Sequence, residues 1–188
     1  MSRWSPNARG RLQEAAHALF LERGYEQTTV ADIAERAELT ERTFFRHFAD
    51  KREVLFGGSA LLQDELRRAV AAAPVDVPTI DAVRSAVEAV SRFMHGRREI
   101  ARELERLIAA HADLRERSLI KRAALTATLA DALKQRGVGE PSASLAADMG
   151  MTVFYVGFAR WVEDRSARDL DDIVREGFDR LKAIASGS

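Results

Sequence analysis

The chain has 188 residues, of which 46% are hydrophobic and 31% are charged, and its 29 basic and 29 acidic side chains cancel to a formal charge of zero. This composition excludes an intrinsically disordered chain, because the apolar fraction is sufficient for a packed core. The lack of cysteine excludes disulfides and thiolate metal sites. A neutral chain also has no global positive field to attract DNA or an anionic membrane, so any contact with DNA must use a local surface.

Apolar residues recur at three- and four-residue spacing along most of the chain, which predicts an all-α fold. No segment has the alternating pattern of a strand. The least polar stretch, Met149–Ala159, is much shorter than the roughly 18 residues typical of a membrane span, so we expect a cytoplasmic protein with no membrane association. The predicted helices cover residues 7–23, 30–37, 41–47, 51–73, 80–95, 98–110, 113–135, 142–164 and 170–185.

Two of these helices are short, and each begins at a threonine suited to the N-cap position, Thr29 and Thr40. Ala34 is small enough to let the two helices cross closely, and Phe44 is expected to pack beneath them. Two short helices joined by a tight turn, after a longer helix, predict a helix-turn-helix whose second helix enters the major groove of DNA. The exposed face of that helix would present Arg42, Thr43, Arg46 and His47.

The segments Thr28-Thr29-Val30-Ala31-Asp32-Ile33-Ala34, Leu39-Thr40-Glu41-Arg42-Thr43-Phe44-Phe45-Arg46-His47-Phe48 and Asp50-Lys51 resemble the DNA-binding signature of the TetR family. The motifs lie within roughly residues 8–56, and the rest of the chain resembles the family only in its helical layout. The resemblance implies a transcriptional regulator, a repressor released by a small molecule. It also implies a helix-turn-helix DNA-binding domain at residues 1–50 and a helical ligand-binding and dimerisation domain at residues 51–188.

The same resemblance assigns roles to single residues in the first domain. Arg42 and Thr43 occupy base-reading positions, and arginine can donate two hydrogen bonds to guanine while the threonine methyl can contact thymine. The positions that contact phosphates are Thr29, Phe45, His47 and Lys51. A lone histidine is also common as a structural residue, so both interpretations of His47 stay open.

Two residues depart from the family pattern. Glu38 stands where glycine usually occupies the turn, so we expect a left-handed backbone there, at a cost of about 1 kcal/mol, and a negative charge near DNA. Phe45 stands where tyrosine is common, and it lacks the hydroxyl that would donate to a phosphate. Both changes are expected to weaken DNA binding without removing the fold.

The second domain is predicted to form a homodimer, which would match a palindromic operator. The stretch Met149–Ala159 has no charged residue, so its helix must be covered on nearly all sides, partly by a partner subunit. Gly150 and Gly157 would permit close helix approach. The last helix would complete a four-helix contact through Leu170, Ile173, Val174, Phe178, Leu181 and Ile184.

An apolar or amphipathic effector is expected in the second domain, because large apolar and polar side chains gather on its inner helices. No catalytic or metal-ligating constellation is predicted, since His95 and His111 lack carboxylates at ligand spacing, and no cofactor is expected. Two alternatives stay open, a helical carrier or enzyme for apolar molecules, and a protein-interaction module that uses the helix-turn-helix as a scaffold. The candidate effector-binding residues are Phe93, Met94, His95, His111, Phe154, Tyr155, Phe158 and Trp161.

Overall fold

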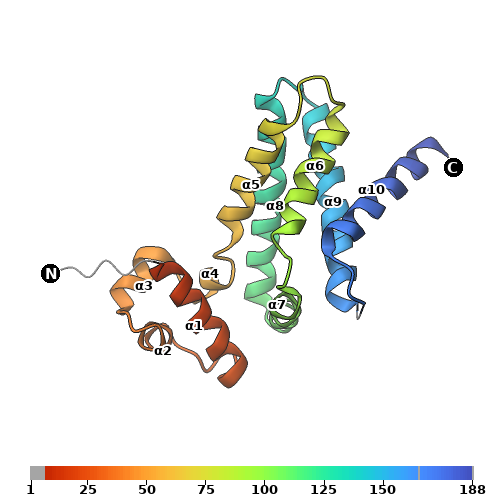
Figure 1. Cartoon of the computed structure of the whole chain (residues 1–188). Coiled ribbons are helices and arrows are strands. Elements are labelled where there is room, and N and C mark those ends of the chain that lie inside the picture. Colours follow the sequence, from red (N-terminus) through yellow and green to blue (C-terminus); the bar gives the residue numbers. More distant parts are fainter. Residues whose placement is uncertain (1–6, 165, 188) are drawn as a thin grey trace. The chain divides into compact units, whose positions relative to one another are not determined.

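The computed structural model describes residues 7–164 and 166–187. These residues form ten α-helices joined by turns and coil, with no strand among them, which confirms the all-α fold (Figure 1). No helix in this described part is both long enough and apolar enough to cross a bilayer. The helices are α1 (Ala8–Arg23), α2 (Val30–Arg36), α3 (Glu41–His47), α4 (Lys51–Leu55), α5 (Ser59–Ala72), α6 (Thr79–Arg92), α7 (Arg98–Ala110), α8 (Ala112–Gln135), α9 (Ser142–Glu163) and α10 (Leu170–Ser186).

The described residues divide into two compact units. The first unit comprises residues 7–58 and Glu103–Ser118, and the second comprises Ser59–Arg102 with residues 119–164 and 166–187. This division differs from the predicted boundary between residues 50 and 51. Its physical reason is burial, since α4 and the corner between α7 and α8 place side chains in the core of the first unit.

One face of α1 supplies the centre of that core. Leu12, Ala16 and Leu19 follow helical spacing and are at most 1% exposed, and Ile33 of α2 and Phe44 of α3 are fully buried beside them. Burying each of the larger apolar side chains contributes about 1.5–3 kcal/mol. The core therefore holds α2 and α3 from beneath, and the opposite side of α3 stays exposed.

The turn between α2 and α3 is a Schellman motif with a non-glycine residue in the left-handed position. Glu38 has φ 53°, its N–H donates to the Glu35 carbonyl at 2.9 Å, and the Leu39 N–H donates to the Ala34 carbonyl at 2.8 Å. These two bonds satisfy carbonyls that the end of α2 leaves without partners. The left-handed conformation expected for Glu38 is confirmed.

The single helix predicted over residues 51–73 is wrong, because α4 ends at Leu55 and α5 begins only at Ser59. Two consecutive glycines interrupt it, and glycine costs about 1 kcal/mol in a helix relative to alanine. Gly57 is buried, and a Cβ atom there would lie 2.5 Å from the side chain of Gln13. The break therefore permits a close approach of α1.

The predicted end of the helix over residues 80–95 also differs. α6 ends at Arg92, and Phe93, Met94 and His95 continue as a tightened turn in which each N–H donates to the carbonyl three residues earlier. Such tightening is common in the last turn of a helix. Gly96 then leaves the helix with φ 70°.

In the second unit, α6 packs against α5, α9 and α10 (Figure 1). The glycines of α9 serve these contacts, since a Cβ atom at Gly150 would lie 2.3 Å from Val83 of α6, and one at Gly157 would lie 3.3 Å from Val174 of α10. The close approach therefore occurs within the subunit. The dimer face predicted for α10 needs correction as well, because four of its six apolar residues belong to the core of the same subunit, namely Leu170, Ile173, Val174 and Phe178.

Candidate DNA interface and effector region

The position of α3 follows from its caps and its buried phenylalanines. The Thr40 hydroxyl accepts a hydrogen bond from the Thr43 N–H at 3.2 Å, and Phe44 and Phe48 are buried beneath the helix. Residues that precede or follow Phe44 by one or two positions therefore face solvent. Arg42 and Arg46 are exposed, as predicted for a DNA-reading face.

These two arginines also differ from the other cations of the first unit. Within residues 7–58, Arg42 and Arg46 make no hydrogen bond, ion pair or ring contact with the described part of the chain. The remaining basic side chains in this range all contact a carboxylate, a backbone carbonyl or an aromatic ring, and they are Arg9, Arg11, Arg23, Arg36, Lys51 and Arg52. Within this range, the side chains that can bind DNA without giving up such a contact are therefore those of Arg42 and Arg46 on α3.

The hydroxyls of the two predicted threonines are used locally. Thr29 forms a capping box with Asp32, in which its hydroxyl accepts from the Asp32 N–H at 3.1 Å and donates to the Asp32 carboxylate at 2.5 Å. These bonds from Thr29 lower the pKa of Asp32. The Thr43 hydroxyl lies 3.1 Å from that of Thr40, so its methyl group remains for DNA together with two lone pairs if it donates, or its proton and one lone pair if it accepts.

The structure places the other three predicted residues differently from one another. Phe45 is 55% exposed next to Arg46. His47 is half-buried, its Nε2 atom is inaccessible and lacks a hydrogen-bond partner in the described chain, and burial together with Arg46 and Arg9 lowers its pKa. The Lys51 ammonium is already held by Tyr25, whose carbonyl accepts from it at 2.8 Å and whose ring centroid is 4.2 Å away.

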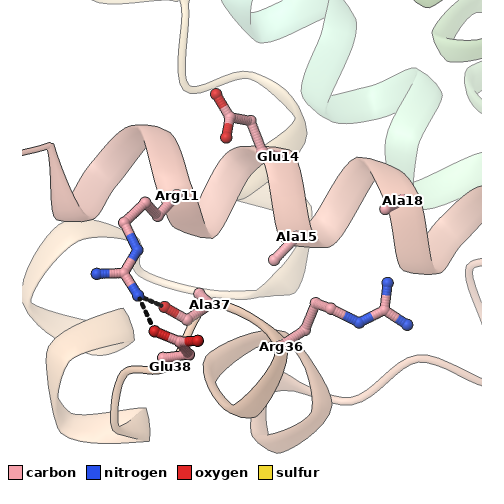
Figure 2. Close-up of a pocket in the computed structure, with 7 residues that line it drawn as sticks. All are labelled: Arg11, Glu14, Ala15, Ala18, Arg36, Ala37 and Glu38. Atoms are coloured by element: carbon pink, nitrogen blue, oxygen red, sulfur yellow. Dashed lines mark hydrogen bonds and ion pairs between the residues drawn. The ribbon is translucent and has the colours of Figure 1, made fainter.

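Glu38 does not carry an isolated negative charge. The Arg11 guanidinium donates to the Ala37 carbonyl and lies 3.3 Å from the Glu38 carboxylate (Figure 2). The groove beside this pair has a volume of about 410 Å³, and Glu14 and Arg36 also line it. The charge that was expected to face DNA is therefore partly compensated by Arg11.

The predicted effector residues of α9 lie together in the second unit. Phe154 and Phe158 stack with ring centroids 6.0 Å apart, and Phe158 lies 5.8 Å from Trp161. Trp161 is 2% exposed, its Nε1 has no hydrogen-bond partner in the described chain, and the Arg98 guanidinium lies 5.1 Å from its ring. Tyr155 follows the same helix and donates its hydroxyl to the Arg122 carbonyl at 3.1 Å.

Of the other predicted effector residues, Met94 packs against the same apolar core as Phe154, Phe158 and Trp161. His111 belongs to the first unit, where its ring lies 4.9 Å from that of Tyr25 and its Nδ1 lies 3.3 Å from Glu26. Phe93 and Met94 are half-buried in the turn after α6. His111 therefore belongs to a different unit from the predicted effector residues of α9.

His95 lies beside two carboxylates that its sequence neighbourhood does not contain. The ligand atoms of His95, Asp169 and Asp171 are within 4.8 Å of one another, and His95 Nε2 is 2.8 Å from Asp171. Burial acts to raise the pKa of Asp171, but the hydrogen bond from His95 and the charge of Arg175 hold it below its usual value. The tertiary structure thus creates a polar cluster at the start of α10.

A short helix with unpaired arginines on its exposed side, braced by two further helices, defines a helix-turn-helix DNA-binding protein. The family model for the tetR family of bacterial regulatory proteins matches residues 12–56, and the model for the MftR C-terminal domain matches residues 77–185. The chain therefore belongs to the TetR family, whose members are DNA-binding transcriptional regulators.

Relatives agree with this assignment. The transcriptional regulator TcmR of Streptomyces glaucescens is 40% identical over 82 residues, which are 44% of this chain and 36% of TcmR. MftR of Mycobacterium tuberculosis is 24% identical over 179 residues, 90% of each chain. The crystal structure of FadR from Thermus thermophilus, a TetR-family repressor in complex with lauroyl-CoA, has a TM-score of 0.58 and 25% identity over 93% of both chains.

Proposed function

We propose that this regulator is a homodimeric repressor that binds a palindromic operator through α3 and is released by an amphipathic molecule with an acyl chain. The observation that carries the DNA-binding part is the pair of unpaired arginines on the exposed side of α3. The other lysine and arginine side chains of residues 7–58 already contact a carboxylate, a carbonyl or a ring, so these two are ready to bind DNA without first giving up such a contact. Because the operator is part of the chromosome, the proposed site of action is the cytoplasm.

The residues divide by the chemistry of their contacts. Arg42 and Thr43 read base edges in the major groove, because a guanidinium donates to guanine and a methyl group contacts thymine. Arg46 and Lys51 bind phosphates, which set the register of the protein on DNA. We assign Thr29, Phe45 and His47 to the edge of the phosphate-facing surface, where the Thr29 hydroxyl proton is already donated to Asp32 and His47 Nε2 is inaccessible.

The proposed dimer interface is an apolar groove between α9 and α10 with a volume of about 220 Å³. Its margin includes Val156, which is 67% exposed, and Ile184, which is 77% exposed. A second copy of the chain would cover these side chains. The dimer would then carry two α3 helices, one for each operator half-site, and the half-sites would lie about 34 Å apart or a multiple of that distance. Val156→Asp should therefore give a monomer in sedimentation and weaken operator binding, while Val75→Asp, at another exposed valine, should do neither. A dimeric Val156→Asp variant would contradict this interface.

An acyl-chain effector is supported by two observations. The T. thermophilus repressor with the same fold was crystallised with lauroyl-CoA. The aromatic row of Phe154, Phe158 and Trp161 is part of the apolar core, with Phe154 5% and Trp161 2% exposed, so an acyl chain would have to insert between these side chains; the buried Nε1–H of Trp161 would then gain a partner from an ester or thioester oxygen. We expect the acyl chain to contact this row.

The DNA-binding proposal is tested with arginine variants on the operator selected from a random DNA pool. Arg46→Ala in both subunits removes two phosphate contacts, so the slope of log K against log salt should become shallower by about 1.8. Arg42→Ala should weaken binding to the selected operator about 10- to 100-fold and relax its preference at one base pair in each half-site. Arg36→Ala is the control, because that side chain is paired with Glu22. Unchanged affinity and slope in both α3 variants would disprove the proposed interface.

The effector proposal is tested separately by titrating lauroyl-CoA into the protein–operator complex. Release is expected with lauroyl-CoA and not with coenzyme A alone. In a Trp4→Phe background the fluorescence reports on Trp161 only, since the chain has two tryptophans. A lauroyl-CoA titration that changes neither operator occupancy nor Trp161 fluorescence would exclude acyl thioesters as effectors.

A further inference from the structure

The Lys51 ammonium is fixed on one side by a residue that no sequence motif marked. Tyr25 accepts from it through the backbone carbonyl at 2.8 Å and faces it with the ring, whose centroid is 4.2 Å away. A lysine ammonium has three N–H donors, and the carbonyl uses one of them. Two donors remain for a phosphate, and their direction depends on where Tyr25 holds the ammonium.

The ring of Tyr25 is held in turn by the corner between α7 and α8. Its hydroxyl donates to the Asp113 carboxylate at 3.2 Å, its ring packs at 4.9 Å from that of His111, and the residue is only 4% exposed. Burial and the negative charge of Asp113 raise the pKa of Tyr25, so the phenol keeps the proton that it donates. The position of the ring is therefore determined from the α7–α8 side.

A second set of contacts joins the same corner to the backbone next to Lys51. Arg117 lies 3.0 Å from Asp50 and 3.5 Å from Glu53, and Asp50 is the N-cap of α4, which begins at Lys51. Asp50 accepts from the Glu53 N–H at 2.9 Å while it pairs with Arg52 at 2.6 Å. The corner thus holds Lys51 through its side chain and through the cap of its helix.

We propose that Tyr25 is a positioning residue for the contact between Lys51 and a DNA phosphate, and that its hydrogen bond to Asp113 sets this position. The inference rests on the proposed phosphate contact of Lys51. It adds that operator affinity depends on a buried phenol that touches no DNA, and on a carboxylate 88 residues away in the sequence.

A double-mutant cycle tests this coupling in the full-length chain. Tyr25→Phe keeps the carbonyl and the ring and removes only the hydroxyl, Lys51→Ala removes the ammonium, and the double variant closes the cycle. Thr128→Val is the control, since it removes a buried hydroxyl in the second unit that donates to the Ala124 carbonyl at 2.8 Å. Asp113→Ala removes the same bond from the acceptor side. Operator affinity and its salt dependence are measured for every variant, with thermal unfolding to verify the folded fraction.

Tyr25→Phe and Asp113→Ala should each weaken operator binding about fivefold when Lys51 is present, and less than twofold in the Lys51→Ala background. Thr128→Val should leave affinity unchanged. Tyr25 is not a positioning residue if Lys51→Ala weakens binding while Tyr25→Phe and Asp113→Ala do not. The same conclusion follows if Tyr25→Phe and Asp113→Ala weaken binding by the same factor in the Lys51→Ala background as in the presence of Lys51. If Lys51→Ala itself has no effect, the phosphate contact fails and the positioning role fails with it.

Discussion

Substitution of Glu38 separates the cost of its backbone conformation from the value of its side chain. Glu38→Gly and Glu38→Ala both remove the carboxylate and its exposed ion pair with Arg11 (Figure 2), so this loss is common to the two variants. The two variants differ in the Cβ atom. At φ 53° this atom destabilises the alanine variant by about 1–2 kcal/mol. The glycine variant instead loses about 0.5–1 kcal/mol, because glycine gives up more backbone entropy on folding. The glycine variant should therefore be more stable than the alanine variant by about 0.5–1 kcal/mol.

The measurement is the free energy of unfolding in urea, followed by circular dichroism. Glu35 is the control, because it is exposed within α2, where glycine should be less stable than alanine by about 1 kcal/mol. The difference in unfolding free energy between the glycine and alanine variants should therefore have opposite signs at positions 35 and 38. An alanine variant at position 38 that equals or exceeds the glycine variant in stability would refute the strain argument.

Three further predictions concern affinity, packing and pH. Phe45→Tyr restores a hydroxyl donor on the exposed side of α3 and should strengthen operator binding about fivefold, measured by fluorescence anisotropy; unchanged affinity would mean that the position does not meet a phosphate. Gly150→Ala places a Cβ atom 2.3 Å from Val83 and should destabilise the protein by about 1–3 kcal/mol, whereas Gly58→Ala, with open space around it, should not. Burial lowers the pKa of His17 from its ordinary value near 6.5, so the unfolded chain binds the proton more tightly and stability is lost as the pH falls below about 6.5. The melting temperature should therefore drop between pH 7.5 and 5.5 and drop less in His17→Leu, and equal drops would exclude His17 as a cause.

The helix-turn-helix was predictable because its signals are local. Thr29 and Thr40 cap α2 and α3 as predicted, and Phe44 is buried beneath them as predicted. Each of these features depends on residues within one or two turns of helix. Two consecutive glycines were a local signal for the break after α4, but only the approach of α1, more than forty residues earlier in the chain, shows why Gly57 must lack a Cβ atom.

The candidate site shows the same division between local and distant information. Helical periodicity alone places Arg42 and Arg46 on the exposed side of α3. Periodicity cannot show that the neighbouring cations are compensated, because Arg11 finds Glu38 and Arg36 finds Glu22 across the fold. It also cannot show that Lys51 is held by Tyr25, which lies 26 positions away.

The sequence by itself determined the class of fold, the order of the helices and the recognition helix, because caps, breakers and apolar spacing act over a few residues. Only the tertiary structure decided which charges are free, which face of α9 and α10 remains exposed, and that His111 packs on Tyr25 in the first unit. Those properties depend on contacts between residues far apart in the chain, and the packing of side chains sets them.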